Sequence, residues 1–218
     1  MDKQTILKAV KTAKEKSKKR KFMQKIDIIF NFKGLDLKKP EQQLDFYFQL
    51  PAGVGKKKKI CAFIGAEMAE TAKALDKAIL IDEFDRYKDN KKLQKKLESE
   101  YDYFIAQANI MPKVAQVFGR VLGPKNKMPN PKAGCVVPAN ANLAVLNDRL
   151  QKTQRVLVKK ALIFQCFVGT EESSDTDIVE NINAIYEQVI HHLPGEKNNL
   201  KSIYVKLTMG EPIAIPIN

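Results

Sequence analysis

The chain has 218 residues, and 44% of them are hydrophobic, which allows one large or two small packed domains and argues against global disorder. Its 38 Lys and Arg against 25 Asp and Glu give a formal net charge of +13, which favours nucleic acid as a partner. No apolar run approaches the ~20 residues of a spanning helix, and a signal-peptide core is lacking, so no membrane partner is expected.

The N-terminal segment carries most of the positive charge. Residues 1–25 hold ten Lys or Arg against Asp2 and Glu15, a net charge of +8. Apolar residues at helical spacing predict a helix over 3–19, with lysines on its other faces. The basic run that follows ends in an aromatic residue, Phe22. Such a run is also typical of a solvated face, so by itself it is only weakly specific.

Long alternating strands are predicted at both ends of the chain. Residues 25–33 place apolar side chains at every second position from Ile26 to Phe32, which predicts a strand with one buried face. Residues 44–50 alternate likewise, and these two strands are expected to form an antiparallel pair. The other predicted elements of the two ends are strands over 155–159, 162–168, 202–208 and 213–217, the last at a sheet edge, and a helix over 175–192.

The middle of the chain has a different pattern, in which short continuous apolar runs alternate with helical segments. This alternation predicts a small α/β sheet of parallel strands buried on both faces. The predicted strands are 60–64, 78–81 and 101–106, and the predicted helices are 66–75, 90–99, 111–118 and 142–151.

The Gly- and Lys-rich segment 51–59 separates the two patterns and is interpreted as a domain boundary. Its Gly-x-Gly-Lys lacks the spacing of a phosphate-binding loop. We therefore expect two domains in a mixed α/β (α+β) fold. Residues 1–57 and 153–218 form a discontinuous α+β domain with an antiparallel sheet, interrupted by an inserted Rossmann-like three-layer α/β domain over 58–152.

The sequence lacks the usual patterns of catalytic and metal sites. Cys61, Cys135 and Cys166 are isolated and odd in number, which suits a reducing cytoplasm better than a disulfide framework. His191 and His192 are the only histidines and point to different faces of the predicted helix, so neither a metal nor another cofactor is expected. An enzyme built on the central α/β domain remains an alternative that only scattered carboxylates support.

A long cationic segment, Gly119–Gly134, stands out in the middle of the chain. Gly and Pro occur in it too densely for a helix or a strand, so a loop is predicted. Its cations, which no acidic residue accompanies, are Arg120, Lys125, Lys127 and Lys132.

The run Gly-Arg-Val-Leu-Gly-Pro-x-x-Lys-Met-Pro-x-Pro within this segment resembles the signature loop of the large-subunit ribosomal protein L-one family, in its archaeal and eukaryotic branch. Asn126 stands where the family usually has a third glycine, and Asn also tolerates positive φ. Three further stretches resemble the same family. They are Lys21-Phe22 before the first strand, Gly169-Thr170 after a later strand, and Ser202 with Thr208-Met209-Gly210 near the C-terminus.

The resemblance implies a ribosomal protein without catalytic activity that binds large-subunit rRNA in the mobile side stalk of the cytoplasmic ribosome. It also implies help in moving and releasing exit-site tRNA, repression of translation through binding its own mRNA, and a monomer off the ribosome. A free-standing RNA-binding regulator is the alternative of the same class. The RNA-binding residues that the resemblance implies, with the basic residues placed around them, are Lys21, Phe22, Lys33, Gln165, Gly169, Thr170, Ser202, Lys206, Thr208, Met209 and Gly210. The secondary basic candidates are Lys18, Lys19, Arg20, Arg120, Lys125, Lys127 and Lys132.

Overall fold

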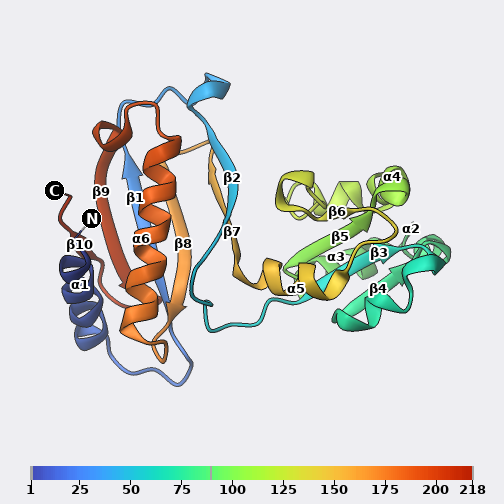
Figure 1. The fold of residues 1–218 in the computed structure, drawn as a ribbon, viewed down its shortest axis with the longest axis horizontal. Coiled ribbons are helices and arrows are strands. Elements are labelled where there is room, and N and C mark those ends of the chain that lie inside the picture. Colours follow the sequence, from blue (N-terminus) through green and yellow to red (C-terminus); the bar gives the residue numbers. More distant parts are fainter. Residues whose placement is uncertain (1, 89, 218) are drawn as a thin grey trace. The chain divides into compact units, whose positions relative to one another are not determined.

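Two separate hydrophobic cores organise the chain, as seen in the computed structural model, which describes residues 2–88 and 90–217. Each core belongs to its own unit of the structure (Figure 1). Unit 1 consists of Met1–Lys56 together with Lys152–Asn218, and unit 2 consists of Lys57–Gln151.

Unit 1 contains an antiparallel sheet of four strands and, beside it, a sheet of two. The larger sheet has the strand order β10 (Ile213–Ile215), β9 (Leu200–Leu207), β1 (Lys25–Phe32) and β8 (Ile163–Thr170), so the C-terminal strand lies at an edge, as its Pro216 indicated. The smaller sheet pairs β2 (Leu44–Gln49) with β7 (Thr153–Val158). The remaining elements are α1 (Lys3–Lys16), α6 (Asp175–His192), and the short 3₁₀ helices η1 (Pro40–Gln42) and η7 (Glu196–Asn199).

The expected antiparallel pair of the first two strands is wrong. Both edges of β1 are occupied, one by β8 and the other by β9, so β2 finds no free edge there. The chain turns away at Gly34, whose φ is 69°, and β2 pairs with β7 instead. The sequence pattern showed that both segments are strands but held no information about which edges the distant β8 and β9 would take.

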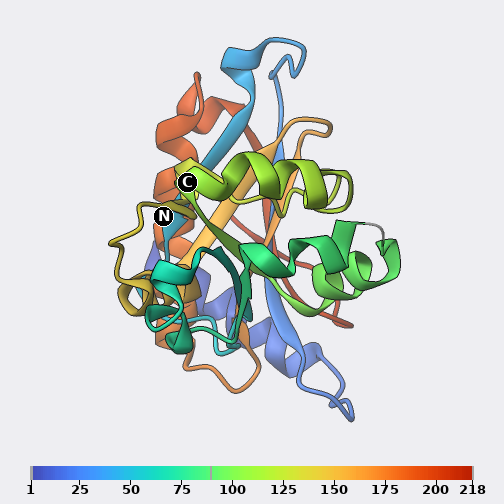
Figure 2. The ribbon, with the colours of Figure 1, turned by 90° about the vertical axis from the view of Figure 1, so that its right-hand side faces the viewer.

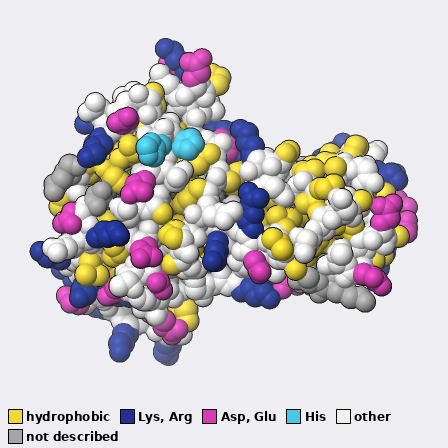
Figure 3. All heavy atoms as spheres, in the orientation of Figure 1, with side chains coloured by type: hydrophobic (Ala, Val, Ile, Leu, Met, Phe, Trp, Pro, Cys, Tyr) yellow, Lys and Arg dark blue, Asp and Glu magenta, His cyan; other side chains and the backbone are white. Residues whose placement is uncertain are grey.

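One face of the four-stranded sheet is buried under the two helices of unit 1, and α6 lies in front of the sheet in Figure 1. The apolar positions of β1 from Ile26 to Phe32 point to this side and are at most 3% exposed, as their alternation predicted. The helix α1 ends at Lys16, three residues earlier than predicted, because Ser17 is already extended. Over the helical face, basic and acidic side chains are interspersed rather than gathered into one basic patch (Figure 3).

Unit 2 contains a parallel sheet with the order β4 (Lys77–Leu80), β3 (Ile60–Ile64), β5 (Tyr103–Gln107) and β6 (Val136–Val137). Phe63 at its centre packs against Phe118 from α4, with ring centroids 4.6 Å apart. Figure 2 looks onto this unit. Its helices are α2 (Phe84–Lys88), α3 (Lys91–Glu100), α4 (Met111–Leu122) and α5 (Leu143–Lys152), and its 3₁₀ helices are η2 (Ala66–Met68), η3 (Thr71–Ala74), η4 (Ile81–Glu83), η5 (Ala108–Ile110) and η6 (Pro131–Ala133).

Two local predictions in unit 2 need correction. The expected helix over 66–75 is a pair of 3₁₀ turns, in which the backbone N–H groups of Ala69 and Leu75 donate to the carbonyls three residues earlier, at 3.3 and 3.0 Å. The cationic segment is not wholly a loop, because Gly119–Leu122 is the last turn of α4. There Leu122 continues the buried stripe of Val114 and Phe118, so packing outweighs the low helix propensity of glycine.

Candidate nucleic-acid interface

The strand order of unit 1 brings three separate segments of the chain to one end of the four-stranded sheet. Lys25 at the start of β1 pairs with Thr170 at the end of β8, and Ile26 pairs with Leu207 at the end of β9. The loops beyond these strand ends therefore lie together, and in both ribbon views the loop between α1 and β1 projects at that end (Figures 1 and 2). We call the exposed loop Lys18–Met23 and the turn Thr208–Gly210 the strand-end surface.

The strand-end surface combines exposed apolar groups with cations. Phe22 is 51% exposed, Met23 48% and Met209 60%, which is unusual for side chains of this kind. The four residues from Lys18 to Lys21 are exposed beside them. Side chains that stack on bases, set among cations that meet phosphates, are the combination used to bind RNA.

Two of the predicted residues in this region have structural partners that the sequence did not reveal. The Thr208 hydroxyl accepts from the Lys25 backbone N–H at 3.0 Å, and so it ties the ends of β9 and β1 together. Gly210 lies so close to the end of α1 that an added Cβ would meet the Ser17 hydroxyl at 3.2 Å. These contacts hold the turn in place while Met209 between them remains exposed.

Gly169 and Thr170 lie at the same end of the sheet but face inwards. A Cβ on Gly169 would meet Ile178 of α6 at 3.0 Å, so this glycine permits the close approach of the helix. Thr170 is 5% exposed, and its hydroxyl shares a hydrogen bond of 3.0 Å with the Ser173 hydroxyl. Their positions indicate that both residues shape the turn, and the buried Thr170 side chain is not available to a partner.

The second part of the candidate interface is the face of the four-stranded sheet that α1 and α6 leave open. Ser202 lies there, and its hydroxyl accepts from the Asn31 amide at 2.9 Å. Gln165 is exposed on β8, and Lys206 of β9 lies opposite Asp27 of β1. Polar groups in fixed positions on a flat sheet suit the shallow minor groove of an RNA helix, where shape and 2′-hydroxyl groups are read.

Lys33 does not join the strand-end surface. It follows the last residue of β1, and its backbone N–H donates to the Asn199 carbonyl at 2.8 Å. Because β1 spans eight residues at about 3.3 Å each, Lys33 lies roughly 25 Å from the loop that holds Phe22. It is exposed, and its contribution to an interface would be made at the opposite end of the sheet.

Asp27 is a carboxylate in the middle of the open face. Partial burial raises its pKa, and a hydrogen bond to Gln165 and the charges of Lys25 and Lys206 oppose this increase. Lys25 in turn lies over the Phe167 ring, with its Nζ 5.3 Å from the ring centroid. The open face therefore alternates cations, one acid and apolar surface.

Some residues of this interface were not among the predicted site residues. Asp27 and Asn31 stand at alternate positions of β1, so its period of two already assigned them to the face opposite the core. Gln24 differs, because it is 1% exposed just before the strand and nothing in the sequence pattern marks it as buried.

The cationic segment of unit 2 has one residue in the conformation that its sequence indicated. Asn126 has φ of 56°, the left-handed value expected where the family has glycine. The Asn126 N–H donates to Gly123 and the Lys127 N–H to Leu122, the two hydrogen bonds that close the end of a helix.

The four cations of this segment divide into one structural and three exposed residues. The Lys127 ammonium donates to the backbone carbonyls of Glu98 at 2.6 Å and Tyr101 at 2.9 Å, and it lies 3.1 Å from the Glu98 carboxylate. Lys127 therefore stabilises the end of α3, and its ammonium is occupied by these contacts and is not free to bind RNA. Arg120, Lys125 and Lys132 are exposed.

Lys127→Met is expected to lower the melting temperature of unit 2 by about 4 °C or more, because the α3 carbonyls lose a charged donor. RNA affinity should stay within about twofold of the parent. Lys125→Met removes the same charge at an exposed position and serves as the control, with no expected change in melting. Calorimetry and RNA titration of both variants give the answer. A Lys127→Met protein that melts normally but binds RNA poorly would assign this cation to the RNA instead.

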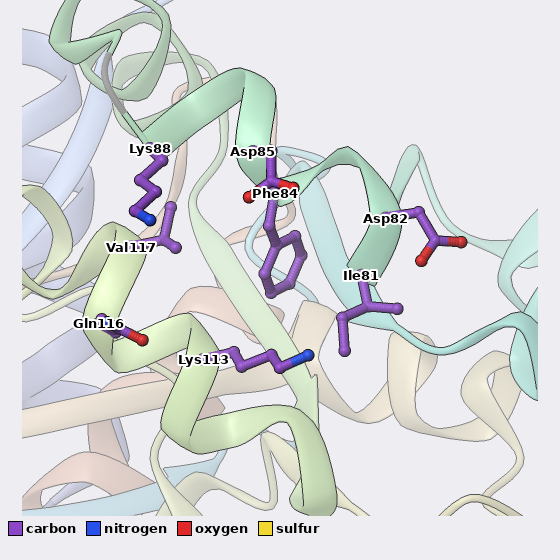
Figure 4. Close-up of a pocket in the computed structure, with 8 residues that line it drawn as sticks. All are labelled: Ile81, Asp82, Phe84, Asp85, Lys88, Lys113, Gln116 and Val117. Carbon is purple, nitrogen blue, oxygen red and sulfur yellow. The ribbon is translucent and has the colours of Figure 1, made fainter.

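The enzyme alternative has a candidate cavity in unit 2, of about 280 Å³. It is an open pocket lined by apolar side chains such as Phe84 and by charged ones such as Asp82, Asp85 and Lys113. In Figure 4 the Asp82 carboxylate is directed away from the Phe84 ring, so Asp82 and Asp85 do not converge on a common point in the cavity. The pocket has no arrangement for general acid and base catalysis.

Other starting points for chemistry are also weak. Burial raises the pKa of all three thiols, that of Cys61 to about 12 and that of Cys135 to about 11, so they are poor nucleophiles. Within residues 2–88 and 90–217, no group of three or more His, Cys, Asp and Glu side chains could hold a metal ion. No described helix has the length and hydropathy to cross a membrane.

The sequence pattern of the ribosomal protein L1p/L10e family matches residues 11–211. This chain belongs to that family. It is 43% identical to the large ribosomal subunit protein uL1 of Methanothermococcus thermolithotrophicus, with 99% of each chain covered. It is 41% identical to the uL1 of Methanothermobacter thermautotrophicus, covering 97% of this chain and 99% of that one, and 37% identical to the uL1 of Pyrococcus horikoshii, covering 98% and 96%.

Family membership decides between the classes of function. The chain is a ribosomal protein of archaeal type, found on ribosomes in the cytoplasm, and not an enzyme. The resemblance seen in the sequence motifs is thereby confirmed, and it extends over nearly the whole chain.

Proposed function

We propose that this L1-family protein is a structural component of the large ribosomal subunit and binds large-subunit rRNA through unit 1. The observation that carries the proposal is the strand-end surface, where Phe22, Met23 and Met209 stand exposed beside the cationic loop Lys18–Lys21. The open sheet face, with Ser202, Gln165 and Lys206, extends the contact along the RNA. The names of the relatives, large ribosomal subunit proteins, agree with this assignment.

The finer parts of the proposed function rest on the resemblance to the L1 family. An rRNA helix held by this protein at the edge of the subunit forms the mobile side stalk, which assists the movement and release of exit-site tRNA. The exposed cations Arg120, Lys125 and Lys132 of unit 2 are available to tRNA phosphates. Because recognition by shape does not depend on the origin of the RNA, a similar fold in the protein's own mRNA allows repression of its translation.

The direct test is binding to large-subunit rRNA purified from Methanothermococcus thermolithotrophicus, the source of the 43% identical relative, followed by footprinting. We expect the protein to protect one compact region of the rRNA. We also expect the monomeric protein to co-sediment with large subunits from which the native L1-family protein has been removed. A protein that binds RNA but does not sediment with large subunits would be a free-standing regulator. Equal affinity for rRNA and for unrelated RNA would contradict specific recognition.

The positive charge of the loop Lys18–Met23 should be visible in the salt dependence of RNA binding. Replacing Lys18, Lys19 and Arg20 by Gln should make the slope of log K against log salt less negative by about two to three units, since each lost phosphate contact removes about one unit. Specificity for the rRNA should remain. The control replaces three exposed lysines of α1, Lys3, Lys8 and Lys11, which carry the same charge outside the loop. Equal slopes in the loop variant and the parent would show that the loop is only a solvated face.

A further inference from the structure

Gln24 is the residue through which the parts of the strand-end surface are joined. It precedes β1, is 1% exposed, and lies beneath the exposed loop that includes Phe22 and Met23. A side-chain amide at such a depth must have partners for its donors and its acceptor. The identity of those partners shows what the residue holds together.

The partners come from three segments that are far apart in the sequence. The Gln24 Nε2 donates to the Ser17 hydroxyl at 3.3 Å, where α1 ends, and to the Lys18 carbonyl at 3.1 Å, where the loop Lys18–Met23 begins. It also lies 3.4 Å from a carboxylate oxygen of Glu171, just after β8. The Gln24 Oε1 accepts from the Met209 backbone N–H at 3.3 Å.

Backbone contacts around Gln24 join the same chain segments. The backbone carbonyl of Gln24 accepts from the Glu171 N–H at 3.1 Å. Across the junction, Gly210 approaches Ser17 so closely that an added Cβ would lie 3.2 Å from its hydroxyl. The loop after α1 and the turn after β9 are therefore in contact, and the Gln24 amide is the polar link between them.

We infer that Gln24 is a positioning residue that holds the loop Lys18–Met23 and the turn Thr208–Gly210 in one RNA-contacting surface. It touches the backbone of Met209 and of Lys18 and leaves their side chains free for the RNA. This inference rests on the proposed function of the strand-end surface. An amide is suited to the place because it offers donors to the loop and an acceptor to the turn at the same time.

The test replaces Gln24 by Met, which keeps the length and volume of the side chain but removes every hydrogen bond that the side-chain amide makes. We expect affinity for the Methanothermococcus thermolithotrophicus large-subunit rRNA to fall by about tenfold or more, the effect of one to two buried hydrogen bonds on the position of the surface. The salt slope should become less negative by about one unit or more, because the loop cations lose their fixed positions.

Asn181→Leu is the matched control. Asn181 is a fully buried amide of the same unit that links the Ala52 N–H, at 3.1 Å, to the Val168 carbonyl, at 3.0 Å, and neither partner belongs to the loop Lys18–Met23 or the turn Thr208–Gly210. Its replacement should lower the melting temperature as much as Gln24→Met does and leave rRNA affinity and salt slope within about twofold of the parent. A merely structural role of Gln24 predicts the same behaviour for both variants.

A second variant separates the two links. Gln24→Glu is made together with Glu171→Gln, so that the net charge is unchanged and no two carboxylates meet. The exchanged pair keeps an acceptor for the Met209 N–H and removes the donors to the loop, so the salt slope should flatten while Met209→Ala still weakens binding. In the Gln24→Met background the effect of Met209→Ala should shrink, because coupled residues are not additive. If Gln24→Met does not fold, the Glu variant alone decides the inference by its salt slope.

The failures of the inference and of the proposed function can be told apart. If Met209→Asp weakens rRNA binding but the Gln24 variants keep the affinity and slope of the parent, Gln24 is a structural residue and the inference is wrong. If Met209→Asp also binds normally, the strand-end surface is not the RNA site, and the inference fails together with the proposed function.

Discussion

Met209→Asp is expected to weaken binding of the purified large-subunit rRNA by about a hundredfold or more while leaving the melting temperature nearly unchanged. Met209 is 60% exposed in a turn that follows β9, so its side chain contributes little to the core. In a complex with RNA the change removes an apolar packing surface, and full burial of a Met side chain contributes about 1.5–3 kcal/mol. It also places an anion against a polyanion.

Val145→Asp provides the control for the introduced charge. Val145 is 64% exposed on α5 in unit 2, so the same anion is added to a similarly exposed apolar position. Affinity should change by less than about threefold there. Calorimetry and filter binding on both variants decide the assignment. A Met209→Asp protein that melts early but binds rRNA normally would place Met209 in the fold and not in the interface.

Thr208→Ala is a less clean probe of the same turn. The Thr208 hydroxyl accepts from the Lys25 N–H at 3.0 Å, so its loss affects the β1 and β9 ends as well as any RNA contact. A loss of about 1–2 kcal/mol in RNA affinity and a small decrease in melting temperature would both follow from that change. The Met209 variant is therefore the decisive one.

The second large effect is a difference in rRNA affinity between the two units when each is prepared by itself. A chain that joins residues 1–56 to 152–218 through a short Gly/Ser linker should fold and bind the rRNA within about threefold of the whole protein. Unit 1 has its own core, and the β2–β7 pair is closed at the cut by the Leu50 N–H donating to the Lys152 carbonyl at 2.9 Å. Phe22 and Met209 both belong to it.

Residues 57–151 alone should bind the same rRNA at least about a hundredfold more weakly at physiological salt, the difference typical of non-specific binding. Their 17 Lys or Arg against 11 Asp or Glu still attract polyanions, so weak binding at low salt is expected. Titrations at two salt concentrations separate the two kinds of binding. Tight, salt-resistant binding by residues 57–151, with none by the joined unit 1, would move the rRNA site to unit 2.

The sequence alone determined, for most elements, whether they are helix or strand and which of their faces is buried. The alternation in β1 predicted which side chains are buried, because a strand has a period of two whatever its neighbours are. The continuous apolar run Ile60–Ile64 predicted a strand buried on both faces, and all five of its residues are buried. The positive φ of Asn126 followed from local chemistry, since few residues other than glycine and asparagine tolerate it.

Only the tertiary structure decided which strands pair and which polar groups are buried. β2 lost its expected partner because β8 and β9, more than a hundred residues later in the chain, occupy both edges of β1. In the sequence Lys127 cannot be distinguished from the other cations of its segment, and only the structure shows that its ammonium donates to carbonyls at the end of α3. Gln24 is an ordinary polar residue in the sequence, and it becomes the junction of the strand-end surface only when three chain segments meet around it. The periodicity of apolar residues in the sequence predicts whether a segment is a helix or a strand and which of its faces is buried. Strand pairing and the burial of single polar residues depend on contacts between distant segments, which no local sequence pattern encodes.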